Sequence, residues 1–393
     1  MEGSHMGEAR NQEWSWLRVY YFEECKDDLI LDGVWPAVQA ASLGEPESQA
    51  YFQRDWLGGP NVLVGLHHAC SRSTELQVAD QVREYLKAHP AKRQFSARHL
   101  SQLTQSLARW EGKPGATSVF LQPNNCVLVE SKEPFSLFLR QDLLKEAVRE
   151  FLSVSSELAL RWLGLIRAGA QQRQYIALQL MIALAWLADP KRLRSHLSFS
   201  SHAEGFLRAG DSNGQLKRAF LDRYEGRQGE TMRQVLKTSV EALQSENGPI
   251  PHMKDFVALL RHTLSDLYQG LREDRYQATP ATEFVGGAFN DPAAFNRMVE
   301  IMDHSPAWRA WQITISLLYQ TLNQLGIKPI ERFLACYLLS RSAEDVYGEP
   351  VGRIMEELER GGEHTVIFSF FAELDQSMGG NPRTTCFQNR VTI

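Results

Sequence analysis

The sequence predicts an α+β protein, in which a small mixed β-sheet with helices in the N-terminal part packs on a mainly helical C-terminal part. Up to about residue 132, aromatic and β-branched runs alternate with helical patterns, and beyond it apolar residues recur almost throughout at the helical period. The chain has 393 residues, which is more than one hydrophobic core usually organises. We therefore expect an α+β portion over 8–132 and a mainly helical portion over 133–393 that together form one intimate unit.

The N-terminal elements follow from local patterns. The run WSWLRVYYF at 14–22 is typical of a strand, and DDLILDGVWPAVQAAS after it has helical spacing with acidic residues at its start. Two extended apolar runs within 51–68 flank a Gly-Gly-Pro turn and predict a hairpin. Two amphipathic helices, ELQVADQVREYLKAH and ARHLSQLTQSLARW, precede a second predicted strand pair, SVFLQP with NNCVLVES.

The C-terminal part is predicted to be a helical layer. The most apolar window, YIALQLMIALAWLA at 175–188, is shorter than the roughly 18 uncharged residues that a membrane span needs, so it indicates a buried helix. Segments 198–215 and 277–293 are rich in Gly, Ser, Pro and Asn and are expected to be loops, where binding sites tend to lie. Apolar residues at helical spacing occupy 137–168, 173–188, 215–226, 252–272, 292–302, 306–326 and 329–345.

Composition excludes several classes of protein. The formal net charge of −5 gives no reason to expect nucleic acid as a partner, and no segment is expected to enter a membrane. The five cysteines are widely spaced without a CxxC pair, which favours a reducing cytoplasm over a disulfide framework or a zinc cluster. His67 and His68 would point to opposite faces of a strand, so a metal site there is not expected. The chain carries no GxGxxG after a strand, P-loop, HExxH or GxSxG motif.

A basic stretch, KAHPAKRQFSARH at 87–99, includes Lys92, Arg93 and Arg98. It is either a solvated loop and helix start or a docking surface for an acidic peptide, because clustered cations attract anionic partners from a distance. Only a docking surface would make binding depend strongly on salt concentration.

The predicted helix WQITISLLYQTLNQLG at 311–326 has one apolar face and one uncharged polar face. The polar face is either the wet side of an amphipathic helix or the wall of a cavity. A merely solvated face normally includes charged residues, and their absence favours the cavity wall. The polar face is formed by Ser316, Tyr319, Gln320, Asn323 and Gln324.

These motifs, in this order, resemble the C-terminal elimination domain of class I lanthipeptide dehydratases and the related stand-alone thiopeptide biosynthesis proteins. The resemblance covers about residues 14 to 348. It rests on an N-terminal W…Y strand, a YF.R.W..GPN hairpin, the Gly286-Gly287 loop, DHS at 303–305, SLLYQTLNQLGI at 316–327 and ERFLACYLLSRSAEDVYG.

Two activities compete within that superfamily. Elimination members remove glutamate from glutamylated Ser or Thr and need a base and cations. Pyridine synthases join two dehydroalanines in a formal aza four-plus-two cycloaddition that closes a macrocycle and releases the leader peptide.

This chain departs from the elimination members where their chemistry lies. Asn61 follows the Gly-Pro pair in place of a histidine, and both arginine positions after it are lost. Phe284 and Val285 precede the Gly-Gly loop, where elimination members have an arginine and an aromatic residue. Tyr319 stands in place of a histidine, and Gln324 stands in place of an arginine. Of the basic residues of the elimination members, only Arg54 remains.

The resemblance therefore implies a pyridine synthase without metal or organic cofactor, acting on a modified precursor peptide with an acidic leader, and associating with dehydratase components. The alternatives are a stand-alone glutamate-eliminating lyase and a non-catalytic peptide-binding scaffold.

We expect Tyr319, Ser316 and Arg54 to be catalytic. Tyr319 would shuttle the proton at the amide, Ser316 would position Tyr319 or the carbonyl, and Arg54 would steady the departing hydroxyl, unless it is a structural ion-pair partner. His304 would supply the last proton to that hydroxyl, or cap a helix. The expected substrate-binding residues are Gln320, Asn323, Trp56, Asn61, Glu283 and His304, and Lys92, Arg93 and Arg98 are expected to bind the leader.

Overall fold

The computed structural model describes residues 14–41, 49–67, 73–110, 120–130, 142–211, 213–245, 248–276, 304–360 and 368–377. The chain forms two compact units, which are described separately. Unit 1 comprises Met1–Ala177 with Ser316–Arg332, and unit 2 comprises Leu178–Ile315 with Phe333–Ile393. Three helices, α5 (Arg173–Ala188), α11 (Pro306–Gln324) and α12 (Pro329–Tyr347), contribute residues to both units.

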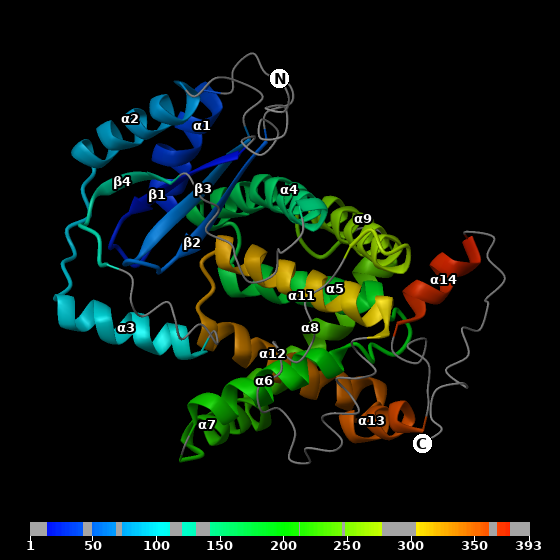
Figure 1. Ribbon diagram of the computed structural model, residues 1–393. Helices are drawn as coiled ribbons and strands as arrows, with labels where there is room; N and C mark the ends of the chain where they lie inside the picture. Colours follow the sequence, from blue (N-terminus) through cyan, green and yellow to red (C-terminus); the bar gives the residue numbers. More distant parts are fainter. Residues whose placement is uncertain are drawn as a thin grey trace, which may run out of the picture. The chain divides into compact units, whose positions relative to one another are not determined.

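Unit 1 contains a four-stranded antiparallel sheet in the order β2-β3-β1-β4 (Figure 1). With helices between β1 and β2 and between β3 and β4, this is the split βαβ arrangement of ferredoxin-like folds. The three described strand pairs are all antiparallel, whereas the expected sheet was mixed. The elements are β1 (Trp14–Tyr20), η1 (Leu29–Val34), α1 (Trp35–Ala41), β2 (Ala50–Asp55), β3 (Asn61–His67), α2 (Ser73–Ala88), α3 (Ala97–Trp110), β4 (Cys126–Glu130) and α4 (Asp142–Arg167).

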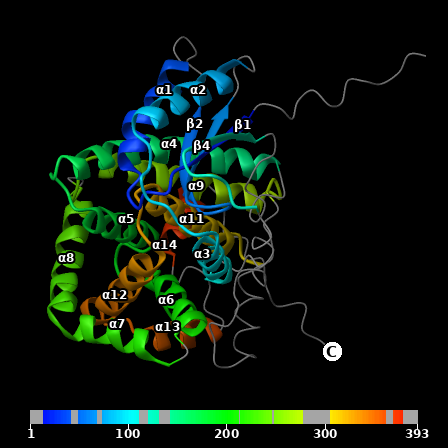
Figure 2. The same ribbon diagram turned by 90° about the vertical axis from the view of Figure 1, so that its left-hand side faces the viewer.

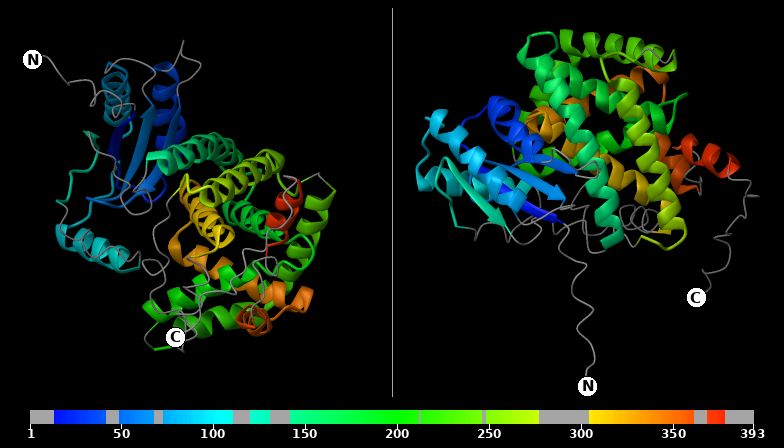
Figure 3. Two further views of the ribbon diagram at one scale, coloured as in Figure 1. Left: turned by 45° about the vertical axis from the view of Figure 1, so that its right-hand side comes forward. Right: turned by 90° about the horizontal axis from the view of Figure 1, so that it is seen from above.

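Strand alternation gives the sheet two different faces. The face that carries Leu17, Val19 and Val64 is apolar and buried, and α1 and α2 cover it, as the view from above shows (Figure 3). Phe52 on this face contacts the ring of Trp35 in α1 at 6.2 Å between centroids. The other face carries Trp14, Trp16, Arg18 and Tyr20, and the guanidinium of Arg149 in α4 lies over the two tryptophan rings.

The turn between β2 and β3 requires its two glycines. Gly58 and Gly59 have φ values of 75° and 124°, in a backbone region that residues with a side chain rarely adopt. A Cβ at Gly58 would also lie 2.8 Å from the hydroxyl of Tyr20. The hairpin predicted over 51–68 is confirmed for the described part of that segment, up to His67.

Unit 2 is helical, with its core built from aromatic side chains and the apolar helix α5. Trp308 and Phe368 meet edge to face at 4.8 Å between centroids, and Phe371 packs on Phe368 at 5.8 Å. Figures 1 and 2 both show α6 beside α12. Besides the shared helices, the elements are α6 (His196–Gly210), α7 (Gln215–Glu225), α8 (Arg227–Gln244), α9 (Met253–Arg272), α13 (Val351–Glu359) and α14 (Ser369–Ser377).

Buried polar contacts join α6 to α12 and to the turn before α13. The ring of His196 contacts the Ser340 hydroxyl at 3.1 Å and the Glu349 carbonyl at 2.9 Å. Burial lowers the pKa of His196, which favours the neutral ring that these two contacts need. Arg194 forms a buried ion pair with Glu349 at 3.0 Å.

Two local predictions were wrong. The segment 198–215 was expected to be a loop, but most of it belongs to α6, whose buried face is formed by Phe199, Ala203 and Phe206. Ser201 bonds within the helix, to the Ser198 carbonyl at 2.8 Å, and the Ser198 hydroxyl accepts from the ring N–H of Trp311 at 2.7 Å, so the loop-like composition was misleading. Strand β4 pairs with β1, and Phe120–Pro123 of SVFLQP is not a strand.

Other predictions are confirmed or fall outside the described residues. The fold class is α+β with a dominant helical part, and α5 is a buried helix as expected. Among the described residues, no helix has the length and apolar character needed to cross a membrane. The expected helix at 292–302 and the loop at 277–293 lie in the part that the structure does not describe.

Candidate active site

Side chains from two helices, α4 and α11, form hydrogen bonds with the backbone of the edge strand β2. The backbone N–H of Phe52 donates to the hydroxyl of Ser156 in α4 at 3.1 Å, and its carbonyl accepts from the side-chain amide of Gln324 at 3.0 Å. Two residues on, the N–H of Arg54 donates to the side-chain oxygen of Asn323 at 2.9 Å. The end of α11 is thereby attached to the edge strand by groups that would otherwise be unsatisfied.

A carboxylate and two arginines hold the C-terminal end of α11. Asp27 accepts from Arg54 at 2.7 Å and from Arg173. Arg54 also donates to the carbonyl of Gln324 at 3.0 Å, and Arg173 donates to the carbonyl of Leu325. Cations at the last carbonyls of a helix are favourable because these groups carry the negative end of its dipole. We call Asp27, Arg54 and Arg173 the arginine clamp.

Burial and charge shift the pKa values of groups at this clamp. Burial raises the pKa of Asp27, but hydrogen bonds from Arg173 and Arg54 outweigh that effect and leave its pKa below the ordinary range. Lys26 is 7% exposed and donates to the Glu23 carbonyl at 2.8 Å. Burial, followed by repulsion from Arg54, lowers the pKa of Lys26 to about 8. Together, Lys26, Arg54 and Arg173 place more positive charge here than the single carboxylate of Asp27 can balance.

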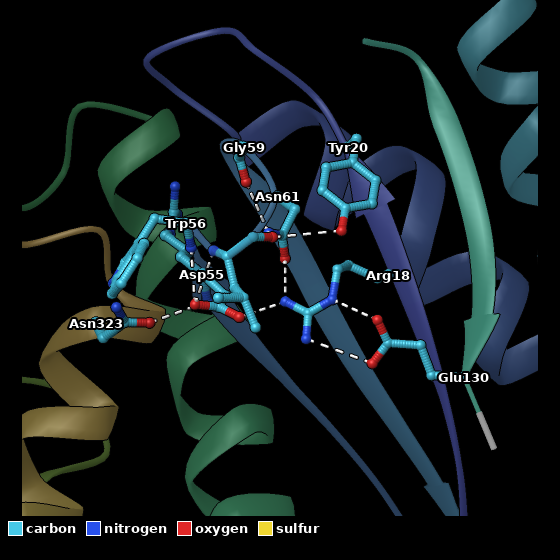
Figure 4. Close-up of polar contacts among 10 residues, drawn as sticks. Arg18, Tyr20, Asp55, Trp56, Gly59, Asn61, Glu130 and Asn323 are labelled. Carbon is cyan, nitrogen blue, oxygen red and sulfur yellow. Dashed lines mark hydrogen bonds and ion pairs between the residues drawn. The ribbon is translucent and has the colours of Figure 1, made fainter. Parts of the chain in front are cut away.

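A second polar network lies on the sheet beside the β2–β3 turn (Figure 4). Arg18 is 1% exposed, donates to Glu130 at 2.7 Å and to the side-chain oxygen of Asn61 at 3.1 Å, and pairs with Asp55. Burial lowers the pKa of Arg18, but the two carboxylates outweigh it and raise that pKa above its ordinary value. The amide nitrogen of Asn61 donates to the Gly59 carbonyl at 2.8 Å, so this side chain braces its own turn.

The polar face of α11 is divided by the structure. Ser316, Tyr319, Gln320 and Asn323 are partly exposed and form one stripe along the helix, which we call the α11 stripe. Gln324, expected on the same face, is fully buried, because its amide bonds the edge strand and the two adjacent serines of α4.

The α11 stripe is not free of charge nearby. The guanidinium of Arg332, in the first turn of α12, lies 4.6 Å from the ring centroid of Tyr319. The α11 stripe itself contains no charged residue, whereas a cation reaches Tyr319 from the next helix.

The structure brings several predicted site residues together at the β2–β3 turn. Asn323 accepts from the backbone N–H of Arg54 near the end of β2. Trp56 and Asn61 flank the turn that follows, and Asn61 donates to the Leu57 carbonyl at 3.1 Å (Figure 4). The N–H of Trp56 donates to Asp55 at 2.7 Å, which fixes the backbone of the residue that begins the turn.

Other predicted residues lie elsewhere. His304 is exposed just before α11 and belongs to unit 2, and Glu283 lies outside the described residues. Lys92, Arg93 and Arg98 are exposed, and Glu23 accepts from the backbone N–H groups of Lys92 and Arg93 at 2.7 and 3.0 Å. The catalytic, substrate-binding and leader-binding roles of all these residues stay predictions.

Sequence reasoning missed the residues that support the site. Asp27, Arg173, Arg332 and Arg18 are charged residues on predicted strands, helices or their ends, where a solvated side chain is the ordinary expectation. Their partners lie 13 to 152 positions away in the chain and on other elements, so the periodicity of a single element gave no signal for them. The one available hint was Arg18, a charge at the centre of an aromatic strand.

A cavity of about 710 Å³ lies in unit 1 between α1 and α4. None of the predicted site residues lines it; its walls include Leu31, Trp35, Val38, Glu150, Val154 and Glu157. Within the described ranges, no group of three or more His, Cys, Asp or Glu side chains could hold a metal ion.

Comparison with known proteins identifies the family to which most of this chain corresponds. Residues 14–343 match the family described as lantibiotic biosynthesis dehydratase C-term. Among solved structures, the chain is similar to "Pyridine synthase, TbtD, from thiomuracin biosynthesis", with a TM-score of 0.66 and 26% identity over 86% of this chain and 99% of that one. It shares the fold of TsrL, with a TM-score of 0.61 and 17% identity over 87% of this chain and 98% of that one. A search of curated proteins found no match. The chain belongs to the lantibiotic biosynthesis dehydratase C-terminal family.

Proposed function

We propose that this protein is a pyridine synthase of thiopeptide biosynthesis, acting on a ribosomally made peptide that carries dehydroalanines. The observation that carries the proposal is the uncharged α11 stripe, in a family member similar in structure to a pyridine synthase over 86% of its length. An eliminase of the same family would need cations at positions where this chain has Asn61, Tyr319 and Gln324.

The proposed cycloaddition can proceed without a charged protein group acting on the substrate. The amide beside one dehydroalanine tautomerises to an iminol, which gives the diene, and two carbon–carbon bonds then form with the alkene of the second dehydroalanine. Loss of water and of the leader as a carboxamide makes the new ring aromatic. Holding the two alkenes together supplies much of the barrier reduction, since good positioning is worth roughly 7 to 11 kcal/mol.

The stripe supplies the groups that such a reaction needs. Tyr319 both donates and accepts a proton, so it can move the amide proton to the oxygen. Ser316 lies one helical turn away and can orient the carbonyl, and Gln320 and Asn323 can hydrogen-bond the peptide backbone. The contacts of Arg54 with Asp27 and the end of α11 favour a role in positioning this helix.

The test is to incubate the purified protein with a leader-bearing peptide that contains azoles and two dehydroalanines, and to follow masses by liquid chromatography. Ring formation with loss of the whole leader supports the proposal. A glutamylated peptide that loses glutamate equivalents would instead show a lyase, and binding without any change in mass would show a scaffold.

Within the same assay, Tyr319→Phe should greatly reduce ring formation while the affinity for the peptide stays the same. Tyr175→Phe, at a partly exposed tyrosine of α5, is the matched control and should leave turnover unchanged. Wild-type turnover in Tyr319→Phe would remove Tyr319 from the mechanism.

A further inference from the structure

The contact between Arg332 and Tyr319 is produced by the hairpin of α11 and α12. Helix α11 ends at Gln324, and Gly326, with φ of 79°, lets the chain reverse before α12 begins at Pro329. Tyr319 lies within the last two turns of α11 and Arg332 lies in the first turn of α12. The two side chains therefore face each other across the reversal, with the guanidinium carbon 4.6 Å from the ring centroid.

The backbone that carries Arg332 is held at several points. The carboxylate of Glu331 accepts from the N–H of Lys328 at 2.9 Å and from the amide of Gln174 at 3.3 Å. The N–H of Arg332 itself donates to the Lys328 carbonyl at 3.0 Å. The start of α12 is thus capped by one of its own side chains and attached to the start of α5.

The arginine clamp fixes the other side of the same reversal. Arg54 and Arg173 bond the carbonyls of Gln324 and Leu325, the last groups before Gly326. A Cβ at Gly326 would lie 3.0 Å from atoms of both arginines, so the turn is closely enclosed. Both helix ends that present the Arg332–Tyr319 pair are therefore held by charged groups rather than by solvent.

We propose that Arg332 is a positioning residue for Tyr319, which fixes the orientation of the phenol ring and stabilises negative charge that develops on its oxygen during proton transfer. This inference rests on the proposed function of the α11 stripe. A guanidinium over an aromatic face attracts the ring electrostatically and, being planar, also stacks on it. Contacts of this kind change an equilibrium by about 2- to 30-fold, which sets the size of effect to expect.

The kinetic test compares Arg332→Leu and Arg332→Lys with wild type in the ring-forming assay. Arg332→Leu should lower kcat about 5- to 30-fold with KM and the affinity for the leader unchanged, because the ring is no longer held. Arg332→Lys should recover part of the loss, since an ammonium keeps the charge but not the stacking. A kcat within twofold of wild type in Arg332→Leu, or a loss seen only in KM, would overturn the proposal.

The matched control is Arg341→Leu. Arg341 lies on the same helix, and its guanidinium stands 5.7 Å from the ring centroid of Tyr224, far along the chain from the α11 stripe. This substitution removes the same kind of contact and should leave kcat unchanged. An equal fall in kcat in both variants would show a general effect on folding and would also overturn the proposal.

A spectroscopic test separates this inference from the proposed function. With 3-fluorotyrosine at position 319, Arg332→Leu should move and broaden the ¹⁹F resonance as the ring loses its fixed orientation, and Arg341→Leu should not. A wild-type protein that forms no ring would refute the proposed function, and the ¹⁹F spectrum would still decide whether Arg332 orients Tyr319. An unchanged resonance in Arg332→Leu would refute the positioning role alone.

Discussion

The side-chain amide of Gln324 donates to the backbone carbonyl of Phe52 at 3.0 Å, joining the last turn of α11 to the edge strand β2 of the sheet. The same amide nitrogen also donates to the Ser156 hydroxyl at 2.8 Å, and the side-chain oxygen of Gln324 accepts from the Ser155 hydroxyl at 3.2 Å. A position that elimination members of the family fill with an arginine is used here as a neutral structural link.

Gln324→Ala should lower the free energy of unfolding by about 1–3 kcal/mol, because it leaves the Phe52 carbonyl and two serine hydroxyls buried without this partner. Urea denaturation followed by far-UV circular dichroism measures the change. Gln320→Ala, one turn earlier on the same helix and partly exposed, should stay within about 0.5 kcal/mol of wild type. Equal losses in the two variants would contradict the assignment of Gln324 as the structural member.

Asp27→Asn should destabilise unit 1 by about 3–5 kcal/mol, since it leaves two largely buried arginines without their carboxylate. The side chain of Asp27 is 8% exposed, whereas Asp80 pairs with Arg83 on the surface with 74% exposure. Asp80→Asn is therefore the control and should keep the wild-type denaturation midpoint. If Asp27→Asn were as stable as Asp80→Asn, the arginine clamp would not be a source of stability.

Lys26 should make the protein more stable as the pH rises from about 8 towards 10.5. Its pKa in the folded protein is about 8, below the ordinary value of 10.5, so in this range the unfolded chain binds a proton that the folded chain does not. Stability rises with pH wherever the unfolded state binds more protons, here by up to about 3 kcal/mol.

The measurement is the free energy of unfolding of wild type minus that of Lys26→Met, taken from urea denaturation at pH 7.5, 8.5 and 9.5. The difference should grow in favour of wild type as the pH rises. Lys87→Met, at a side chain that is 72% exposed, should give a difference independent of pH. A flat difference for Lys26→Met would show that the ammonium is not destabilised by its burial.

Replacing Lys92, Arg93 and Arg98 together by alanine should weaken binding of an acidic leader peptide and flatten its dependence on salt. These side chains are exposed, so their attraction for an anionic peptide is screened by ions. Fluorescence anisotropy of a labelled leader at 50 and 300 mM NaCl measures both effects. The control replaces the exposed Lys217, Arg353 and Arg360 of unit 2 and should bind like wild type.

Most helices and strands could be predicted from the sequence, because hydrophobic periodicity is a local property that burial in any core must satisfy. It also placed Ser316, Tyr319, Gln320 and Asn323 on one face of a helix. It missed α6, whose serine and glycine content is typical of loops, and it could not show that β4 pairs with β1. The burial of Gln324, the pairing of Asp27 with two arginines and the contact of Arg332 with Tyr319 became visible only in the folded protein. Such contacts depend on how distant segments approach one another, and no local pattern records the partner of a buried charge.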